Sequence, residues 1–200
     1  MIFRKENIND AEGSILAHKK SGDGWVIKKG KVLSKDDCSN LIAVGVKELF
    51  VATLETGDIH EDIAASWVAG KITGSYVKSN KAFTGRCNLV AEKSGLLSFD
   101  KDKFNKLNFI NEAITVATLP QKTVVKPGQI VATVKIIPFA ISDSIKKDVS
   151  LILESIAHGV FIKPFLNKSF VMINTTVKSL KESVVTKTTE ITKKRIDKLC

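Results

Sequence analysis

The C-terminal end of the chain constrains the fold most, because it holds one strand and one helix with nothing to cover them. Residues 169–176 (SFVMINTT) are apolar and β-branched, which predicts a buried strand. Residues 191–200 (ITKKRIDKLC) predict an unfinished amphipathic helix, which reaches Cys200 without a glycine C-cap. A lone strand and helix cannot cover their own apolar faces. We therefore expect one complete domain over residues 1–165 and the truncated start of a second over residues 166–200.

The composition is that of a soluble globular protein, with 44% hydrophobic and 26% charged residues. Its apolar runs are all shorter than the roughly 20 residues that a membrane-spanning helix needs. The first seven residues, MIFRKEN, have no apolar core and contain an acid, which argues against a secretory signal. We expect a cytoplasmic protein without a membrane partner.

The net charge of +10 raises the question of nucleic-acid binding. Arginine occurs only at positions 4, 86 and 195, and the lysines are spread along the chain without a block of like charges or interleaved aromatic residues. A nucleic-acid-binding face normally combines clustered basic residues with aromatic side chains. The pattern argues against nucleic acid as a partner, and it is compatible with a small phosphorylated ligand.

No metal site is predicted. The three cysteines are far apart and form no Cys-x-x-Cys pair, and His18, His60 and His158 are isolated from one another. Glu61 and Asp62 follow His60 in the first turn of a predicted helix, where acids complement the helix dipole. We take that as a sufficient explanation for both acids.

The predicted fold class is mixed α/β, with a β-rich N-terminal domain that contains about four helices. Their expected N-caps are Ser34, Asp58, Asp100 and Ser142, and the expected ends of three of them are Gly45, Gly70 and Gly159. Strands are predicted at residues 12–18, 25–28, 49–54, 114–119, 129–137 and 160–164, and residues 75–100 are expected to be rich in strands.

The loop from Ala82 to Asn88 carries the densest chemistry of the chain. Thr84 offers a hydroxyl, Gly85 a permissive backbone, Arg86 a planar cation and Asn88 an amide. Such a loop can hold a phosphate through two hydrogen bonds from the arginine, with the glycine letting the backbone approach. The alternative is a structural turn in which Arg86 pairs with a neighbouring acid such as Glu92. The sequence leaves both interpretations open.

Four stretches together resemble, in order, the MoeA-like molybdopterin-binding proteins of molybdenum cofactor metabolism. They are residues 10–18, 27–33, 82–89 and 131–139. The resemblance implies that this region precedes a three-layer α/β domain of the MogA/MoeA type, which binds the pterin and would start at Ser169 here. The glycine-rich loops with which that family holds molybdopterin or a nucleotide have no counterpart in the chain, so no catalytic residue is assigned.

The resemblance implies a molybdopterin-binding protein of molybdenum cofactor biosynthesis or handling, with molybdopterin as cofactor and a small pterin phosphate as ligand. The expected binding residues are Thr84, Gly85, Arg86, Asn88 and Lys135. A second copy of the chain or a molybdoenzyme is a further expected partner. The alternative is an architectural or dimerisation domain of a larger molybdo- or cytidylyltransferase, whose active site would lie beyond residue 200.

Overall fold

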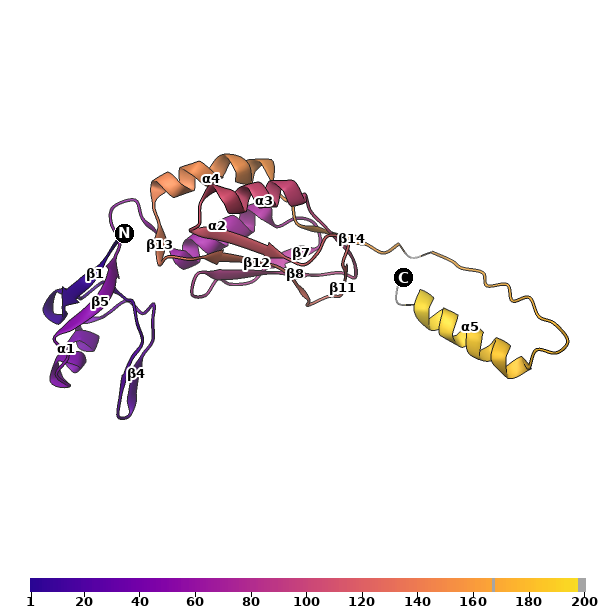
Figure 1. The fold of residues 1–200 in the computed structure, drawn as a ribbon, viewed down its shortest axis with the longest axis horizontal. Coiled ribbons are helices and arrows are strands. Elements are labelled where there is room, and N and C mark those ends of the chain that lie inside the picture. Colours follow the sequence, from indigo (N-terminus) through magenta and orange to yellow (C-terminus); the bar gives the residue numbers. More distant parts are fainter. Residues whose placement is uncertain (167, 198–200) are drawn as a thin grey trace.

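The computed structural model describes residues 1–166 and 168–197, which form two hydrophobic clusters and a C-terminal extension (Figure 1). One cluster lies within residues 1–54, which we call the N-terminal unit. The other lies within residues 59–164, which we call the central unit. The fold is mixed α/β and rich in strands, with five α-helices among the described residues.

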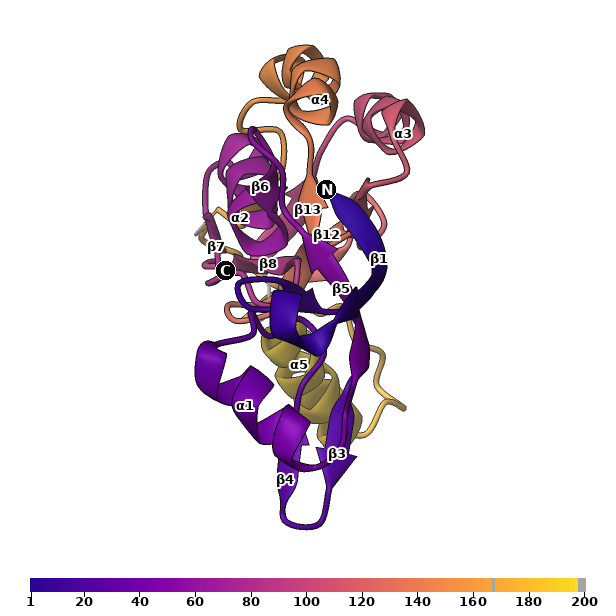
Figure 2. The same ribbon diagram turned by 90° about the vertical axis from the view of Figure 1, so that its left-hand side faces the viewer.

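The N-terminal unit is built on a three-stranded antiparallel sheet of order β1-β5-β2. Its elements are β1 (Ile2–Asn7), β2 (Ile15–Leu16), the hairpin strands β3 (Lys20–Gly22) and β4 (Trp25–Ile27), α1 (Lys35–Ala43) and β5 (Glu48–Thr53), with a 3-10 turn at Ile8–Asp10. Leu16, Leu41 and Leu49 are each 1% exposed and form the centre of its core. Figure 2 looks onto this unit, with the β3-β4 hairpin projecting away from the central unit.

Three small antiparallel sheets and three helices make up the central unit. The largest sheet has the order β10-β12-β8-β7, formed by β7 (Val77–Ser79), β8 (Arg86–Ala91), β10 (Ile114–Thr118) and β12 (Ile130–Ile136). The others are β11 (Val124–Val125), β9 (Gly95–Ser98) and β14 (Phe161–Pro164), and the pair β13 (Ala140–Ile141) and β6 (Ile59–His60). The helices are α2 (Glu61–Ile72), α3 (Lys101–Ile110) and α4 (Asp143–Ser155).

The two faces of the largest sheet differ sharply. Side chains alternate along each strand, so Cys87 and Val134 are buried beneath α2, which packs on β8 and β12. The opposite face carries no helix (Figure 1) and presents polar residues such as Arg86, Asn88 and Lys135. Burial of the apolar face fixes the register of the strands, and this register sets the positions of the polar residues.

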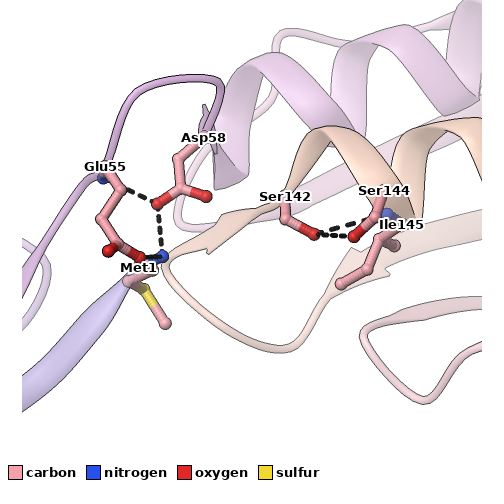
Figure 3. Close-up of polar contacts among 6 residues, drawn as sticks. All are labelled: Met1, Glu55, Asp58, Ser142, Ser144 and Ile145. Carbon is pink, nitrogen blue, oxygen red and sulfur yellow. Dashed lines mark hydrogen bonds and ion pairs between the residues drawn. The ribbon is translucent and has the colours of Figure 1, made fainter.

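Most of the predicted helix starts are confirmed. Ser34, Asp100 and Ser142 are the N-caps of α1, α3 and α4, and Ser34 forms the expected capping box with Asp37. In Figure 3 the Ser142 hydroxyl lies against the backbone N–H of Ile145 at the start of α4.

The predicted start of α2 at Asp58 is wrong. The N-cap is His60, whose Nδ1 accepts from the backbone N–H of Asp62 at 3.3 Å. Asp58 instead accepts from the backbone N–H of Glu55 and pairs with the Met1 ammonium group (Figure 3). The ends of two helices also differ from the prediction. Here α2 continues through Gly70 to Ile72, and α4 ends at Ser155.

The predicted buried strand at residues 169–176 is wrong. These residues are exposed and form no strand, because no other strand of the described chain lies beside them to pair with their backbone. The predicted helix is present as α5 (Glu182–Ile196), which has no buried residue and lies apart from both units in Figure 1. Cys200 lies outside the described residues. Within the described chain, no helix is long and apolar enough to cross a membrane.

Candidate functional site

Two adjoining cavities of about 330 Å³ and 480 Å³ open where the N-terminal unit meets the central unit. Both are lined by Lys29, Gly30, Glu61 and Thr84. The smaller also reaches Lys135, Ile137 and Phe139, and the larger reaches Val26, Lys28, Lys31, His60, Asp62 and Phe83. We call the two cavities together the junction cleft. Its size suits a small molecule rather than a macromolecular segment.

Thr84 and Gly85 form a tight two-residue turn at the wall of the junction cleft. Both have positive φ angles, 48° and 68°, as the two central residues of a type I′ hairpin turn require. The flanking residues Phe83 and Arg86 exchange two backbone hydrogen bonds of 2.9 and 3.1 Å. The sequence therefore located this turn correctly, and its glycine is needed for the backbone conformation.

The backbone groups of Gly85 are already bonded within the protein. Its N–H donates to Oδ1 of Asp62 at 2.7 Å, and its carbonyl accepts from the N–H of Ile136 at 2.7 Å. An aspartate of α2 therefore occupies the backbone N–H that an approaching phosphate would otherwise meet. The turn is anchored to the helix start on one side and to β12 on the other.

Lys135 extends from β12 toward the same turn. Its Nζ donates to the Thr84 carbonyl at 2.7 Å and lies 4.0 Å from Oε2 of Glu61. The structure thus places two of the five predicted binding residues, Thr84 and Lys135, in the lining of the junction cleft, with Gly85 next to Thr84 in the turn. The lysine links the turn to an acid that the sequence did not single out as a binding residue.

Glu61 is the first residue of α2 and is only 6% exposed. Its backbone N–H donates to the Phe139 carbonyl at 2.8 Å, which fixes the helix start against the loop after β12. Burial raises the pKa of the Glu61 carboxyl above its usual range; the charge of Lys135 opposes this shift and that of Asp62 adds to it. A buried acid at a cavity wall is a recurrent feature of functional sites.

The N-terminal unit supplies cations to the opposite wall of the junction cleft. Lys29 lies with its Nζ 5.2 Å from the centre of the Phe139 ring, and it forms no ion pair within the described residues. Lys31 pairs with Asp37 at 2.6 Å. The junction cleft therefore has a basic wall from the N-terminal unit, and a wall from the central unit that carries Glu61 and Asp62 beside Lys135.

Arg86 and Asn88, the other two predicted binding residues, lie on the open face of the sheet beside the junction cleft. Arg86 is exposed and stands opposite Lys135 in the pairing of β8 with β12. Within the described residues it forms no ion pair, with Glu92 or any other acid. Asn88 accepts a hydrogen bond of 2.8 Å from the Thr133 hydroxyl. Neither residue lines the junction cleft itself.

No protein-family model, curated protein or solved structure matched the chain in the comparisons made.

Glu61 and Asp62 are the residues that sequence reasoning missed. The helix dipole explains why acids are favourable in a first turn, but not why one of them is buried at a cavity and the other bonded to a distant turn. Glu61 shares the smaller cavity with residues from stretches 27–33, 82–89 and 131–139, and Asp62 is bonded to Gly85 in the second of these. Within the described residues, no group of three or more histidine, cysteine or acidic side chains could hold a metal ion.

A further cavity of about 440 Å³ lies within the N-terminal unit, between the β3-β4 hairpin and α1. It is lined mainly by apolar side chains, including Trp25 and Leu41, and its charged residues Lys31 and Asp37 are paired with each other. Unlike the junction cleft, it offers a ligand no unpaired buried charge.

Proposed function

We propose that this protein binds a phosphorylated pterin at the junction cleft and acts in the biosynthesis or handling of the molybdenum cofactor. One observation carries the proposal: three of the four stretches that resemble the MoeA-like proteins line this cleft, and the fourth is hydrogen-bonded to one of them. Lys29, Thr84 and Phe139 come from three of them and line the cleft. The N–H of Gly30 donates to the carbonyl of Leu16, from the fourth stretch, at 2.8 Å.

The distribution of charge supports an anionic ligand. Lys29 and Arg86 form no ion pair within the described residues, so their charges are free to meet a phosphate. The N–H of Gly85 is bonded to Asp62 and is not available to the ligand. Gly85 contributes to the site because it has no side chain. Lys135 holds the turn through the Thr84 carbonyl. In this proposal Asn88 extends the polar surface from the cleft along β8.

The first experiment asks whether the protein carries a pterin. The chain is purified without oxygen from a host that makes molybdenum cofactor, then oxidised, and pterin fluorescence is measured per mole of protein. A stoichiometric signal is the expected result. A folded protein without pterin, which also fails to bind an added 6-substituted pterin monophosphate, would contradict the proposal.

Variants then locate the site. Lys29→Ala should weaken binding of the pterin monophosphate roughly 10-fold or more, the usual effect of losing a charged hydrogen bond. Arg86→Ala should weaken it less, because Arg86 lies beside the cleft and acts on the phosphate through its charge. Lys101→Ala, on the exposed surface of α3, is the matched control and should bind normally. Loss of stability in Arg86→Ala without a change in binding would show that the arginine is structural.

A second candidate function is an architectural domain of a larger molybdo- or cytidylyltransferase. The observation that favours it is the exposed C-terminal extension, where Val171 is 90% exposed and Ile173 is 84% exposed. A row of exposed apolar side chains usually marks a site that binds another protein surface. Light scattering would support this function if it gave a defined oligomer while the pterin titration gave no binding.

A further inference from the structure

The Glu61 carboxylate has no hydrogen-bond donor among the described residues, although its side chain is only 8% exposed. Its nearest cation, Nζ of Lys135, is 4.0 Å away and donates to the Thr84 carbonyl instead. Every fully buried side-chain oxygen or nitrogen in the described chain has a partner. The two unpartnered oxygens therefore keep a small exposed area, and because Glu61 lines the junction cleft, a ligand in the cleft can reach them.

Two glycines border this carboxylate. A methyl group added at Gly85 would lie 2.5 Å from Oε2 of Glu61, and one added at Gly30 would lie 3.9 Å from Oε1. Both positions have positive φ angles, of 68° and 85°. The two glycine backbones therefore come close to the carboxylate without a side chain that covers it, so a flat ring edge can approach it from the cleft.

An ionised carboxylate only accepts hydrogen bonds, and it repels a phosphate. The part of the ligand that meets Glu61 must therefore present N–H donors. A 2-amino-4-oxopyrimidine ring carries a ring N–H and an amino N–H side by side, at the spacing that a carboxylate binds through both oxygens. The phosphate of the same ligand then lies toward Lys28 and Lys29, on the basic wall.

We infer that Glu61 is the specificity residue of the junction cleft and accepts two hydrogen bonds from the 2-amino-4-oxopyrimidine edge of the ligand. This inference rests on the proposed function and adds the orientation of the ligand and the residue that selects it. Phe83, which is 72% exposed, and Val26, which is 54% exposed, line the larger cavity and provide apolar contact for the ring.

The test compares two ligands that differ at one position. The first is a 6-substituted pterin monophosphate, and the second is its lumazine counterpart, in which oxygen replaces the 2-amino group. The wild-type protein should bind the pterin at least 10-fold more tightly, because the lumazine oxygen faces the carboxylate without a proton. Titration calorimetry or fluorescence quenching measures both dissociation constants.

Glu61→Gln should reverse this preference. Its amide offers one acceptor for the ring N–H and one donor for the lumazine oxygen, so the variant should bind the lumazine ligand at least as tightly as the pterin. Glu112→Gln, at an exposed position outside the cleft, is the control and should keep the wild-type ratio. A thermal melt of each variant shows whether it is folded.

The outcomes separate the two proposals. If the wild type binds pterin and lumazine equally, or if Glu61→Gln folds and keeps the wild-type ratio, the role of Glu61 is wrong while pterin binding stands. If the wild type binds neither ligand, both proposals are wrong. The wild-type ratio alone tests the inference even if the variant fails to fold.

Discussion

The N–H of Gly85 and the carboxylate of Asp62 are joined by a hydrogen bond of 2.7 Å between a hairpin turn and the start of α2. These residues are 23 positions apart in the chain. Because an acid of the protein itself holds the turn, the N–H of Gly85 is not available to a ligand. A ligand phosphate would have to bind to side-chain cations nearby.

Gly85→Ala should destabilise the protein strongly. An alanine at this φ of 68° costs roughly 1–2 kcal/mol, and its methyl group would also lie 2.5 Å from Oε2 of Glu61 and 2.8 Å from the Ile136 carbonyl. Gly128→Ala is the control, since Gly128 has a similar φ of 84° and open space around it. Urea unfolding should show a clearly larger loss of unfolding free energy for Gly85→Ala, and equal losses would refute the contact.

Glu61→Gln should raise the melting temperature at neutral pH. The pKa of Glu61 is raised in the folded protein, chiefly by burial, so its charge disfavours folding at pH values above the ordinary glutamate pKa of about 4.3. The advantage of the variant should grow as the pH rises from about 4.3 through the raised pKa and then level off. Melts from pH 4 to pH 8 measure this, and an advantage that is largest at acid pH would contradict the burial effect.

Asp58→Asn should lower the melting temperature by a few degrees, since about 1 kcal/mol corresponds to 2–4 °C in a chain of this size. The carboxylate is paired with the Met1 ammonium and accepts from the N–H of Glu55 at 2.8 Å (Figure 3). Burial acts to raise the pKa of Asp58, but these two contacts outweigh it and hold the pKa below its usual value. The hydrogen bonds that the Met1 ammonium donates to the carboxylates of Asp58 and Glu55 raise the pKa of this amine.

The pH dependence of this pair follows from both shifts. The carboxylate contribution is present above the ordinary aspartate pKa of about 3.9 and is lost as the pH falls through the lowered value. The amine contribution is present below its ordinary pKa of about 8 and is lost as the pH rises through the raised value. The effect of Asp58→Asn should therefore be largest between about pH 4 and pH 8. Asp148→Asn, at an exposed position of α4, should show no such window.

A chain that ends after residue 166 should be as stable as the full chain, within about 0.5 kcal/mol. None of the residues of α5 is buried, and a helix of 15 residues rich in threonine and valine is marginal in water on its own. Urea unfolding of both chains, followed by near-ultraviolet circular dichroism, makes the comparison. A clear loss of stability on truncation would mean that the extension packs against the rest of the protein.

Sequence reasoning was most accurate where a structure depends on a few neighbouring residues. Ser34, Asp100 and Ser142 cap their helices because a side-chain oxygen reaches a backbone N–H two or three positions ahead. The turn at Thr84–Gly85 was located correctly because Gly85 readily adopts a positive φ angle.

Other features depend on partners that are distant in the chain, and only the tertiary structure decided them. The pairing of β1 with β5 makes a strand of Ile2–Asn7, which has no strong pattern of its own. Residues 169–176 do have a strand pattern, yet no neighbouring strand pairs with them within the described residues.

The candidate site shows the same division. The sequence by itself determined the turn at Thr84–Gly85, because it follows from local backbone preferences, while Arg86 and Asn88 proved to belong to strand β8 and not to a loop. Only the packing of two units brought Lys29 and Lys135 to the same cleft and buried Glu61 at its wall. The burial of a charge, and therefore its pKa and its openness to a ligand, depends on all the atoms that surround it, which no local pattern specifies.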